Sequence, residues 1–168
     1  EGVSIIDKSI VMVGAGGAAR SIAIQTALEG ANKIIVLNRT FEKAVNIVNI
    51  INRNILTCEA KAEVLNDKNL KIALEKADIL INSTSLGMYP YEDKSIISDE
   101  SAMPPNLIVS DLIYKPFKTK LLKLAEKRGC KCINGLGMLI WQGGFAFKLW
   151  TGKEMPVNSI KEKFLTKM

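Results

Sequence analysis

The sequence predicts a doubly wound α/β fold whose core is a parallel sheet of about six strands. Short apolar runs rich in β-branched residues alternate with longer segments of helical periodicity along the chain. Such runs are typical of parallel strands that helices cover on both faces. The first run ends in a glycine turn at residues 14–17, which opens the first helical segment, as in a βαβ unit.

The apolar runs and the segments between them define the expected elements in order. Strands are expected at Ile10–Val13, Lys33–Asn38, Thr57–Ala62, Ile79–Asn82, Leu107–Asp111 and Lys131–Ile133. Helices are expected at Gly17–Glu29, Phe41–Asn52, Asp67–Glu75, Lys118–Lys127, Leu136–Trp150 and Val157–Leu165. This alternation predicts the strand order 3-2-1-4-5-6, with a ligand at the carboxyl ends near the first and fourth strands. Residues 87–105 are the least periodic and are expected to form a loop with one helical turn.

The size and composition of the chain indicate one globular domain spanning residues 1–168. Of its 168 residues, 48% are hydrophobic and the mean hydropathy is +0.14, which suits one well-filled core. No apolar run reaches the roughly 18–20 residues of a membrane span, and the start at Glu1 does not resemble a signal peptide. The three cysteines form no CxxC pair, which favours a reduced, cytoplasmic protein.

The charge pattern and the lack of histidine narrow the possible functions. The net charge is +6, and basic residues cluster between Lys115 and Lys131. Because Leu121, Leu122 and Ala125 mark a buried side of this segment, its lysines are interpreted as a solvated face. The more specific alternative is that these lysines bind nucleic acid, but neither an alternation of aromatic residues with the lysines nor a binding motif supports it. The absence of histidine excludes Ser-His-Asp and Cys-His nucleophiles and His-ligated metals, and no metal site is expected.

The glycine turn fits the G-x-G-x-x-G/A pattern of a dinucleotide-binding site. Gly14 permits the tight turn, Gly16 lets the backbone approach a pyrophosphate, and Ala19 keeps the helix close to the sheet. The phosphates would rest on the N-terminal amides of the following helix. Because the turn lies between a strand and a helix, with a second strand about 20 residues later, nucleotide binding is favoured over a purely structural turn.

The tip of the second strand indicates which dinucleotide binds. An Asp or Glu there favours NAD, since a carboxylate accepts a bond from the ribose 2′-hydroxyl and repels a 2′-phosphate. Here the tip carries Asn38, Arg39 and Thr40, and Lys43 follows in the next helix. Arg39 and Lys43 therefore predict a clamp for the 2′-phosphate of NADP. The alternative is that both are solvated residues at a helix start.

Two further motifs are less decisive. Residues 82–88 read NSTSLGM after the fourth strand, so Ser83 and Thr84 either bind a cofactor ribose or phosphate or form a polar turn. Tyr114 and Lys118 spell the Y-x-x-x-K pair of short-chain dehydrogenases. Pro116 between them breaks the helix that this chemistry needs, so the match is interpreted as chance.

Five motifs in this order resemble the cofactor domain of the shikimate dehydrogenase family: GAGGAAR, NRTFEKA, NSTSLGM, DLIYKPFKTKLL and NGLGMLIWQGGFAFKLWTG. The resemblance runs from about Ile10 to Pro156, which is most of the chain. It implies a Rossmann-type NADP-binding domain of an oxidoreductase. This family reduces 3-dehydroshikimate to shikimate with NADPH in aromatic amino-acid biosynthesis.

The resemblance also assigns roles to residues. It implies that the cofactor is held by Gly14, Ala15, Gly16, Gly17, Ala18, Asn38, Arg39, Thr40, Lys43, Leu112, Gly135 and Met138. Of these, Leu112 (often Met in the family) and Gly135 would flank the nicotinamide, with Met138 nearby. Tyr114 and Gln142 match the positions through which this domain touches shikimate. Met138 and Gln142 lie one helical turn apart, so they face the same way.

One part of the family's sequence pattern is missing. The family's N-terminal domain carries a catalytic Lys and Asp in motifs resembling N-V-T-x-P-x-K and G-x-N-T-D, and neither occurs here. The chain is therefore expected to be the cofactor half alone and to contain no catalytic residue of its own. It should bind NADP(H) but not turn over shikimate, because hydride transfer to a ketone needs a proton donor at the carbonyl oxygen. The small-molecule substrate would bind together with the missing domain, with neither nucleic acid nor membrane as a partner.

Two other functions remain open. One is a quinate/shikimate dehydrogenase with NAD or dual specificity, against which Asn38-Arg39-Thr40 counts. The other is a non-catalytic nucleotide-sensing module, in which Tyr114 and Gln142 would lack a purpose. Separately, the apolar residues of the last helix have near-helical spacing, so pairing of two copies as a homodimer is a further hypothesis.

Overall fold

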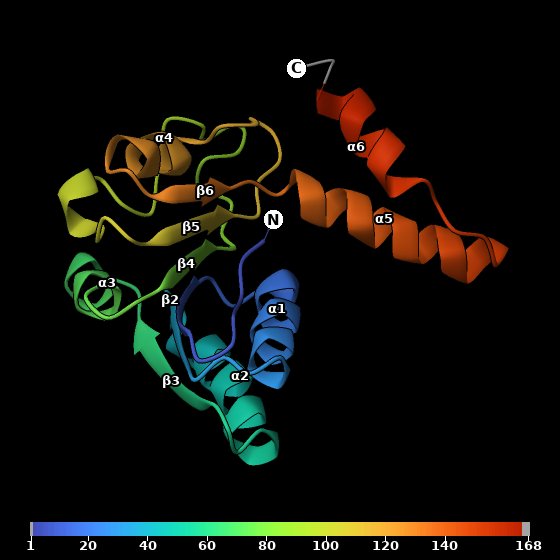
Figure 1. The fold of residues 1–168 in the computed structure, drawn as a ribbon. Coiled ribbons are helices and arrows are strands. Elements are labelled where there is room, and N and C mark those ends of the chain that lie inside the picture. Colours follow the sequence, from blue (N-terminus) through green and yellow to red (C-terminus); the bar gives the residue numbers. More distant parts are fainter. Residues whose placement is uncertain (1, 166–168) are drawn as a thin grey trace.

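The computed structural model describes residues 2–165. Within these residues, six parallel strands form one sheet in the predicted order β3-β2-β1-β4-β5-β6, with helices on both faces (Figure 1). The strands are β1 Ser9–Val13, β2 Lys33–Asn38, β3 Glu59–Val64, β4 Ile79–Asn82, β5 Ile108–Asp111 and β6 Lys131–Ile133. The helices are α1 Gly17–Leu28, α2 Phe41–Asn54, α3 Asp67–Leu74, α4 Lys120–Lys127, α5 Leu136–Thr151 and α6 Val157–Leu165. The 3-10 helix η1 Glu100–Ala102 lies in the long loop between β4 and β5.

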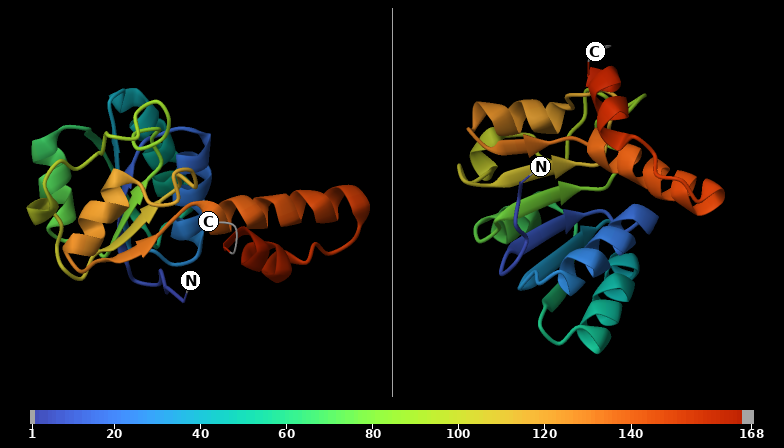
Figure 2. Two further views of the ribbon diagram at one scale, coloured as in Figure 1. Left: turned by 90° about the horizontal axis from the view of Figure 1, so that it is seen from above. Right: turned by 45° about the vertical axis from the view of Figure 1, so that its right-hand side comes forward.

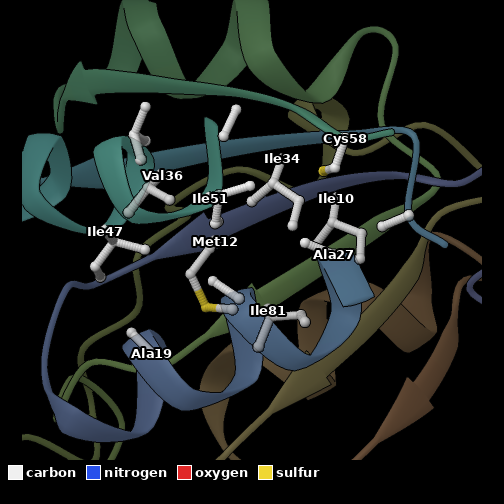
Figure 3. Close-up of a cluster of buried hydrophobic side chains, with 14 of the residues drawn as sticks. Ile10, Met12, Ala19, Ala27, Ile34, Val36, Ile47, Ile51, Cys58 and Ile81 are labelled. Atoms are coloured by element: carbon white, nitrogen blue, oxygen red, sulfur yellow. The ribbon is translucent and has the colours of Figure 1, made fainter. Parts of the chain in front are cut away.

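The sheet divides the core into two apolar layers. Along β1, Ile10 and Met12 pack with α1 and α2, whereas Val11 and Val13 pack with α3 and α4. Figure 3 shows the first of these layers, where side chains of β1 and β2 meet those of the two helices. All four β1 side chains are buried, as their run predicts, and each such side chain contributes about 1.5–3 kcal/mol by leaving water. Burial on both faces holds β1 in place within the sheet, and with it the carboxyl end of the strand.

Alanines bring α1 close to the sheet. Ala19, Ala23 and Ala27 lie four residues apart on one face of the helix, and all three are fully buried. Side chains this small let the helix axis approach the strands, as the position of Ala19 predicts. The N-terminus of α1 is therefore held at the carboxyl end of β1.

Most element ends lie within two residues of the sequence-based expectation, and two elements, β3 and α4, begin two residues later than expected. β3 runs Glu59–Val64 rather than 57–62, because the Asn52 side chain donates to the Ala60 carbonyl and accepts from the Ala60 amide, both at 2.9 Å. These bonds tie the strand to α2 beyond the expected start. α4 begins at Lys120 rather than at residue 118, because the Thr119 hydroxyl accepts a bond from the Leu122 amide at 3.4 Å and caps the helix.

α5 and α6 form a hairpin that projects away from the sheet (Figures 1 and 2). Gly152 ends α5 with φ 69°, and Gly144 lies so close to Val157 that a Cβ there would be 3.1 Å from Val157 Cγ2. Large apolar side chains of this hairpin remain exposed, and we call them the hairpin surface: Met138, Trp141, Phe145, Phe147, Leu149, Trp150 and Phe164. No helix within residues 2–165 combines the length and apolar character needed to cross a membrane.

Candidate cofactor site

The glycine turn joins three strands at the carboxyl edge of the sheet. Gly14 has φ 106°, its amide donates to the Leu37 carbonyl at 2.8 Å, and a Cβ on it would overlap the Ser83 hydroxyl. The Ser83 hydroxyl in turn donates to the Val13 carbonyl at 2.9 Å. A side chain at position 14 is thus excluded both by the backbone angle and by β4, as the tight-turn role of Gly14 predicts.

The next two glycines face open space. A Cβ on Gly16 or Gly17 would meet nothing within 4 Å. Gly16 is the N-cap of α1, no side chain caps the helix, and its first turn holds no acidic residue. The amides of this turn therefore point at a cradle that an anion fits, since a helix N-terminus favours negative charge.

A pocket of about 280 Å³ lies beside this cradle. It is lined by Ala15, Gly16, Gly17, Arg20, Lys43, Asn46, Ile47 and Ile50. The structure thus brings Lys43 of α2 to the glycine turn, and the 2′-phosphate clamp of Arg39 and Lys43 stays a prediction. Arg39 is exposed and does not line this pocket, whereas Arg20 does. The sequence-based reasoning missed Arg20, although its place in the first turn of a helix after the glycine turn was a usable signal.

A hydrogen bond between neighbouring residues holds the turn at the tip of β2. The Asn38 side chain donates to the Thr40 carbonyl at 2.8 Å, and Thr40 is the N-cap of α2 without a side-chain bond. Asn38 therefore shapes the turn that places Arg39 and Lys43 at the start of α2. Direct contact of Asn38 or Thr40 with a ligand stays a prediction.

The hydroxyl groups in the turn after β4 form hydrogen bonds to neighbouring protein groups. The Thr84 hydroxyl donates to Asn82 Oδ1 at 2.7 Å and accepts from the Leu86 amide at 3.2 Å, and Ser83 is bonded to Val13. Such bonds are typical of a polar turn, which is one of the two interpretations of NSTSLGM given above. Cofactor binding by Ser83 and Thr84 remains a prediction.

A buried polar cluster lies beneath the ends of β4 and β5. Asp111, Asn82 and Thr119 are each fully buried. Asp111 accepts bonds from the Thr119 hydroxyl at 2.7 Å, Asn82 Nδ2 at 3.1 Å and the Ile113 amide at 3.2 Å. Burial raises the pKa of the Asp111 carboxyl, and the bonds from Thr119, Ile113 and Asn82 oppose that rise. The sequence-based reasoning missed this cluster.

Leu112 and Gly135 lie in direct contact, and their role beside the nicotinamide stays a prediction. The Gly135 amide donates to the Ile113 carbonyl at 3.1 Å, and a Cβ on Gly135 would overlap the Leu112 carbonyl. Met138 follows in the first turn of α5, where it is exposed. The end of β5 and the start of α5 therefore meet at the same edge of the sheet as the glycine turn.

The Shikimate / quinate 5-dehydrogenase family model matches residues 2–111, and the model of the shikimate 5′-dehydrogenase C-terminal domain matches residues 135–163. The chain belongs to the shikimate / quinate 5-dehydrogenase family. A shikimate dehydrogenase (NADP(+)) of Alkaliphilus metalliredigens is 57% identical over 167 residues, which are 99% of this chain and 58% of that protein. The chain thus spans little more than half the length of this relative.

Solved structures of the shikimate / quinate 5-dehydrogenase family share the fold. The shikimate 5-dehydrogenase of Listeria monocytogenes, in complex with shikimate and NAD, has a TM-score of 0.90 and 42% identity, covering 97% of this chain and 57% of that one. A shikimate dehydrogenase in complex with NADP⁺ has a TM-score of 0.81 and 40% identity, covering 97% of this chain and 55% of that one.

In this member of the shikimate / quinate 5-dehydrogenase family, Tyr114 and Gln142 are both exposed. Tyr114 lies in the loop between β5 and α4, and Gln142 lies on α5, one turn beyond Met138. Lys118 precedes α4 and pairs with Glu126 at 2.8 Å. Tyr114 and Lys118 therefore share no helix, which confirms the structural reason for treating their spacing as chance.

Proposed function

We propose that this chain is the NADP(H)-binding part of a shikimate dehydrogenase, which converts 3-dehydroshikimate and NADPH to shikimate and NADP⁺. The observation that carries the proposal is the pocket that the uncapped glycine turn shares with Lys43 and Arg20. Helix amides supply donors for a pyrophosphate, and the two cations of this pocket suit a ligand that carries several phosphates. The Alkaliphilus relative, named as NADP(+)-dependent, supports the choice of cofactor.

The adenosine end of the cofactor would lie over β1 and β2. Gly16, Gly17 and the first-turn amides of α1 bind the pyrophosphate in this proposal, because nothing else fills the space before them. Lys43 and Arg39 bind the 2′-phosphate at the tip of β2. Neither position offers a carboxylate that would repel it.

The nicotinamide end would lie over β4 and β5. NADPH would supply the hydride when bound, and Leu112, Gly135 and Met138 would hold its nicotinamide ring. Tyr114 and Gln142 are exposed at the same edge, and in this proposal they bind the substrate, shikimate or 3-dehydroshikimate. This arrangement follows the rule that ligands of such sheets bind outside the carboxyl ends of the strands.

The proton that completes the reduction has to come from another group. We assign it to the catalytic Lys and Asp that the family resemblance implies, in the part of the Alkaliphilus relative's length that this chain does not span. The chain by itself therefore binds cofactor without turning over shikimate. Shikimate-dependent NADPH production by the purified chain, above a heat-treated control, would contradict this part of the proposal.

Calorimetric titration with NADP⁺ and with NAD⁺ tests the cofactor assignment. We expect NADP⁺ to bind tighter by about tenfold or more, which corresponds to roughly 1.4 kcal/mol. Lys43→Ala should remove most of this preference. Lys68→Ala, the same loss of charge at an exposed position of α3, should leave it unchanged. Binding of neither dinucleotide by the unaltered chain would overturn the proposal.

NAD or dual specificity is the second candidate function. It is favoured by one observation, the NAD bound to the Listeria relative. Equal affinity for NAD⁺ and NADP⁺ in the same titration would select it.

A further inference from the structure

The buried cluster around Asp111 joins the segments that the proposed function places around the nicotinamide. Asp111 accepts one bond from Asn82 at the end of β4 and one from the Ile113 amide in the loop after β5. It accepts a third from Thr119, the N-cap of α4. Asn82 extends the cluster, since its Oδ1 accepts from the Thr84 amide at 3.0 Å and from the Thr84 hydroxyl at 2.7 Å. One carboxyl group thus fixes the loops after both strands.

The bonding pattern indicates that this carboxyl is ionised. The Ile113 amide can only donate, and Asn82 must present its amide nitrogen to Asp111 because its oxygen already accepts from Thr84. The Thr119 hydroxyl donates to Asp111 Oδ2 at 2.7 Å while its oxygen accepts from the Leu122 amide at 3.4 Å. All three neighbours therefore donate, and a carboxylate is the form that accepts from all of them.

Within residues 2–165, the hydrogen bonds to Asp111 come from neutral groups, with no cation among these donors. A buried charge without a counterion acts over a longer distance than an exposed one, because little water screens it. The next residue in the chain is Leu112, whose carbonyl lies against Gly135.

We infer that Asp111 is a positioning residue of the cofactor site, whose buried carboxylate fixes the loops on either side of the nicotinamide and favours the oxidised over the reduced cofactor. The inference rests on the proposed function, because it takes the dinucleotide to cross from β2 over the ends of β4 and β5. The nicotinamide ring carries a positive charge when oxidised and none when reduced. A nearby anion therefore stabilises bound NADP⁺ more than bound NADPH.

The test compares the dissociation constants of NADP⁺ and NADPH for three forms of the chain by calorimetry. Asp111→Asn keeps the shape of the side chain but removes its charge, and should raise the ratio of the NADP⁺ to the NADPH constant by about fivefold or more. Thr84→Val is the matched control, because it loosens the same cluster while leaving the three donors to Asp111 intact. It should weaken binding of both forms alike.

A purely structural role for Asp111 predicts a different result. Both variants would then weaken NADP⁺ and NADPH equally, and an unchanged ratio in Asp111→Asn would overturn the inference. Carbon-13 NMR of the Asp111 carboxyl in the unaltered chain is a second test that does not need the variant to fold. A protonated carboxyl at neutral pH would also overturn it. Failure of the unaltered chain to bind either cofactor would overturn the proposed function and this inference together, whereas an unchanged ratio overturns only the inference.

Discussion

The Gly135 amide donates a hydrogen bond to the Ile113 carbonyl at 3.1 Å, and this bond joins the loop after β5 to the start of α5. The two segments are so close that any Cβ at position 135 would overlap the Leu112 carbonyl. A backbone contact of this kind cannot relax by turning a side chain. The position is therefore closed to every residue except glycine unless the loop or the helix moves.

Gly135→Ala should destabilise the chain and weaken NADP⁺ binding together. Overpacking of this kind costs about 1–3 kcal/mol, which urea denaturation would measure. Gly143→Ala on the same helix is the control, because a Cβ there meets nothing within 4 Å. It should leave stability unchanged or raise it by up to about 1 kcal/mol. Equal stability of the two variants would contradict the prediction.

Gly17→Ala should separate folding from binding. The added methyl group meets no protein atom within 4 Å, and alanine favours the first turn of α1 by up to about 1 kcal/mol over glycine. The methyl group would stand where the proposal puts the pyrophosphate. We therefore expect unchanged or higher thermal stability, with NADP⁺ affinity lower by about tenfold in calorimetry. Full retention of affinity would place the phosphates elsewhere.

Asp78 should make stability depend on pH in acid solution. Its carboxylate accepts from the Ser9 amide at 2.8 Å and from Lys8 at 3.1 Å, and these bonds lower its pKa. Because the pKa is lower in the folded than in the unfolded chain, the stabilisation is complete above the ordinary value of about 3.9 and is lost as the pH falls through the folded value.

Urea denaturation of Asp78→Asn at a series of pH values checks this expectation. The variant should be less stable than the unaltered chain at neutral pH, and the difference should shrink below about pH 4. Glu92→Gln, which alters an exposed carboxyl in the long loop, is the control and should show no such difference at neutral pH. A deficit in Asp78→Asn that stays constant down to the most acid point would contradict the assignment.

The sequence predicted the strand order and the glycine turn because both depend on patterns local to the chain. Burial of a parallel strand requires a continuous apolar run, and the approach of β4 requires a glycine at position 14. The start of β3 was wrong because it depends on the Asn52 side chain, which reaches eight residues along the chain to Ala60.

Asp111 and Arg20 were missed for a similar reason. A polar residue at the end of an apolar run looks the same whether it is solvated or buried. Only the fold brings Asn82, which is 29 residues away in the chain, against Asp111. The proposed role of Arg20 likewise depends on Lys43, because the packing of α2 beside α1 brings both residues to the same pocket.

The hairpin surface should make the isolated chain associate with a second copy. Trp141 and Phe145 lie with ring centroids 6.3 Å apart, and Trp150 is 81% exposed near the end of the same helix. Contiguous apolar patches larger than a few hundred Å² are rare on monomers and mark contact surfaces. Light scattering over a concentration series should therefore show a dimer at high concentration. The double variant Phe145→Ser, Trp150→Gln should shift it to monomer, whereas Leu56→Gln, at an exposed apolar residue outside the hairpin surface, should not. A strictly monomeric unaltered chain at the highest concentration would rule out the pairing.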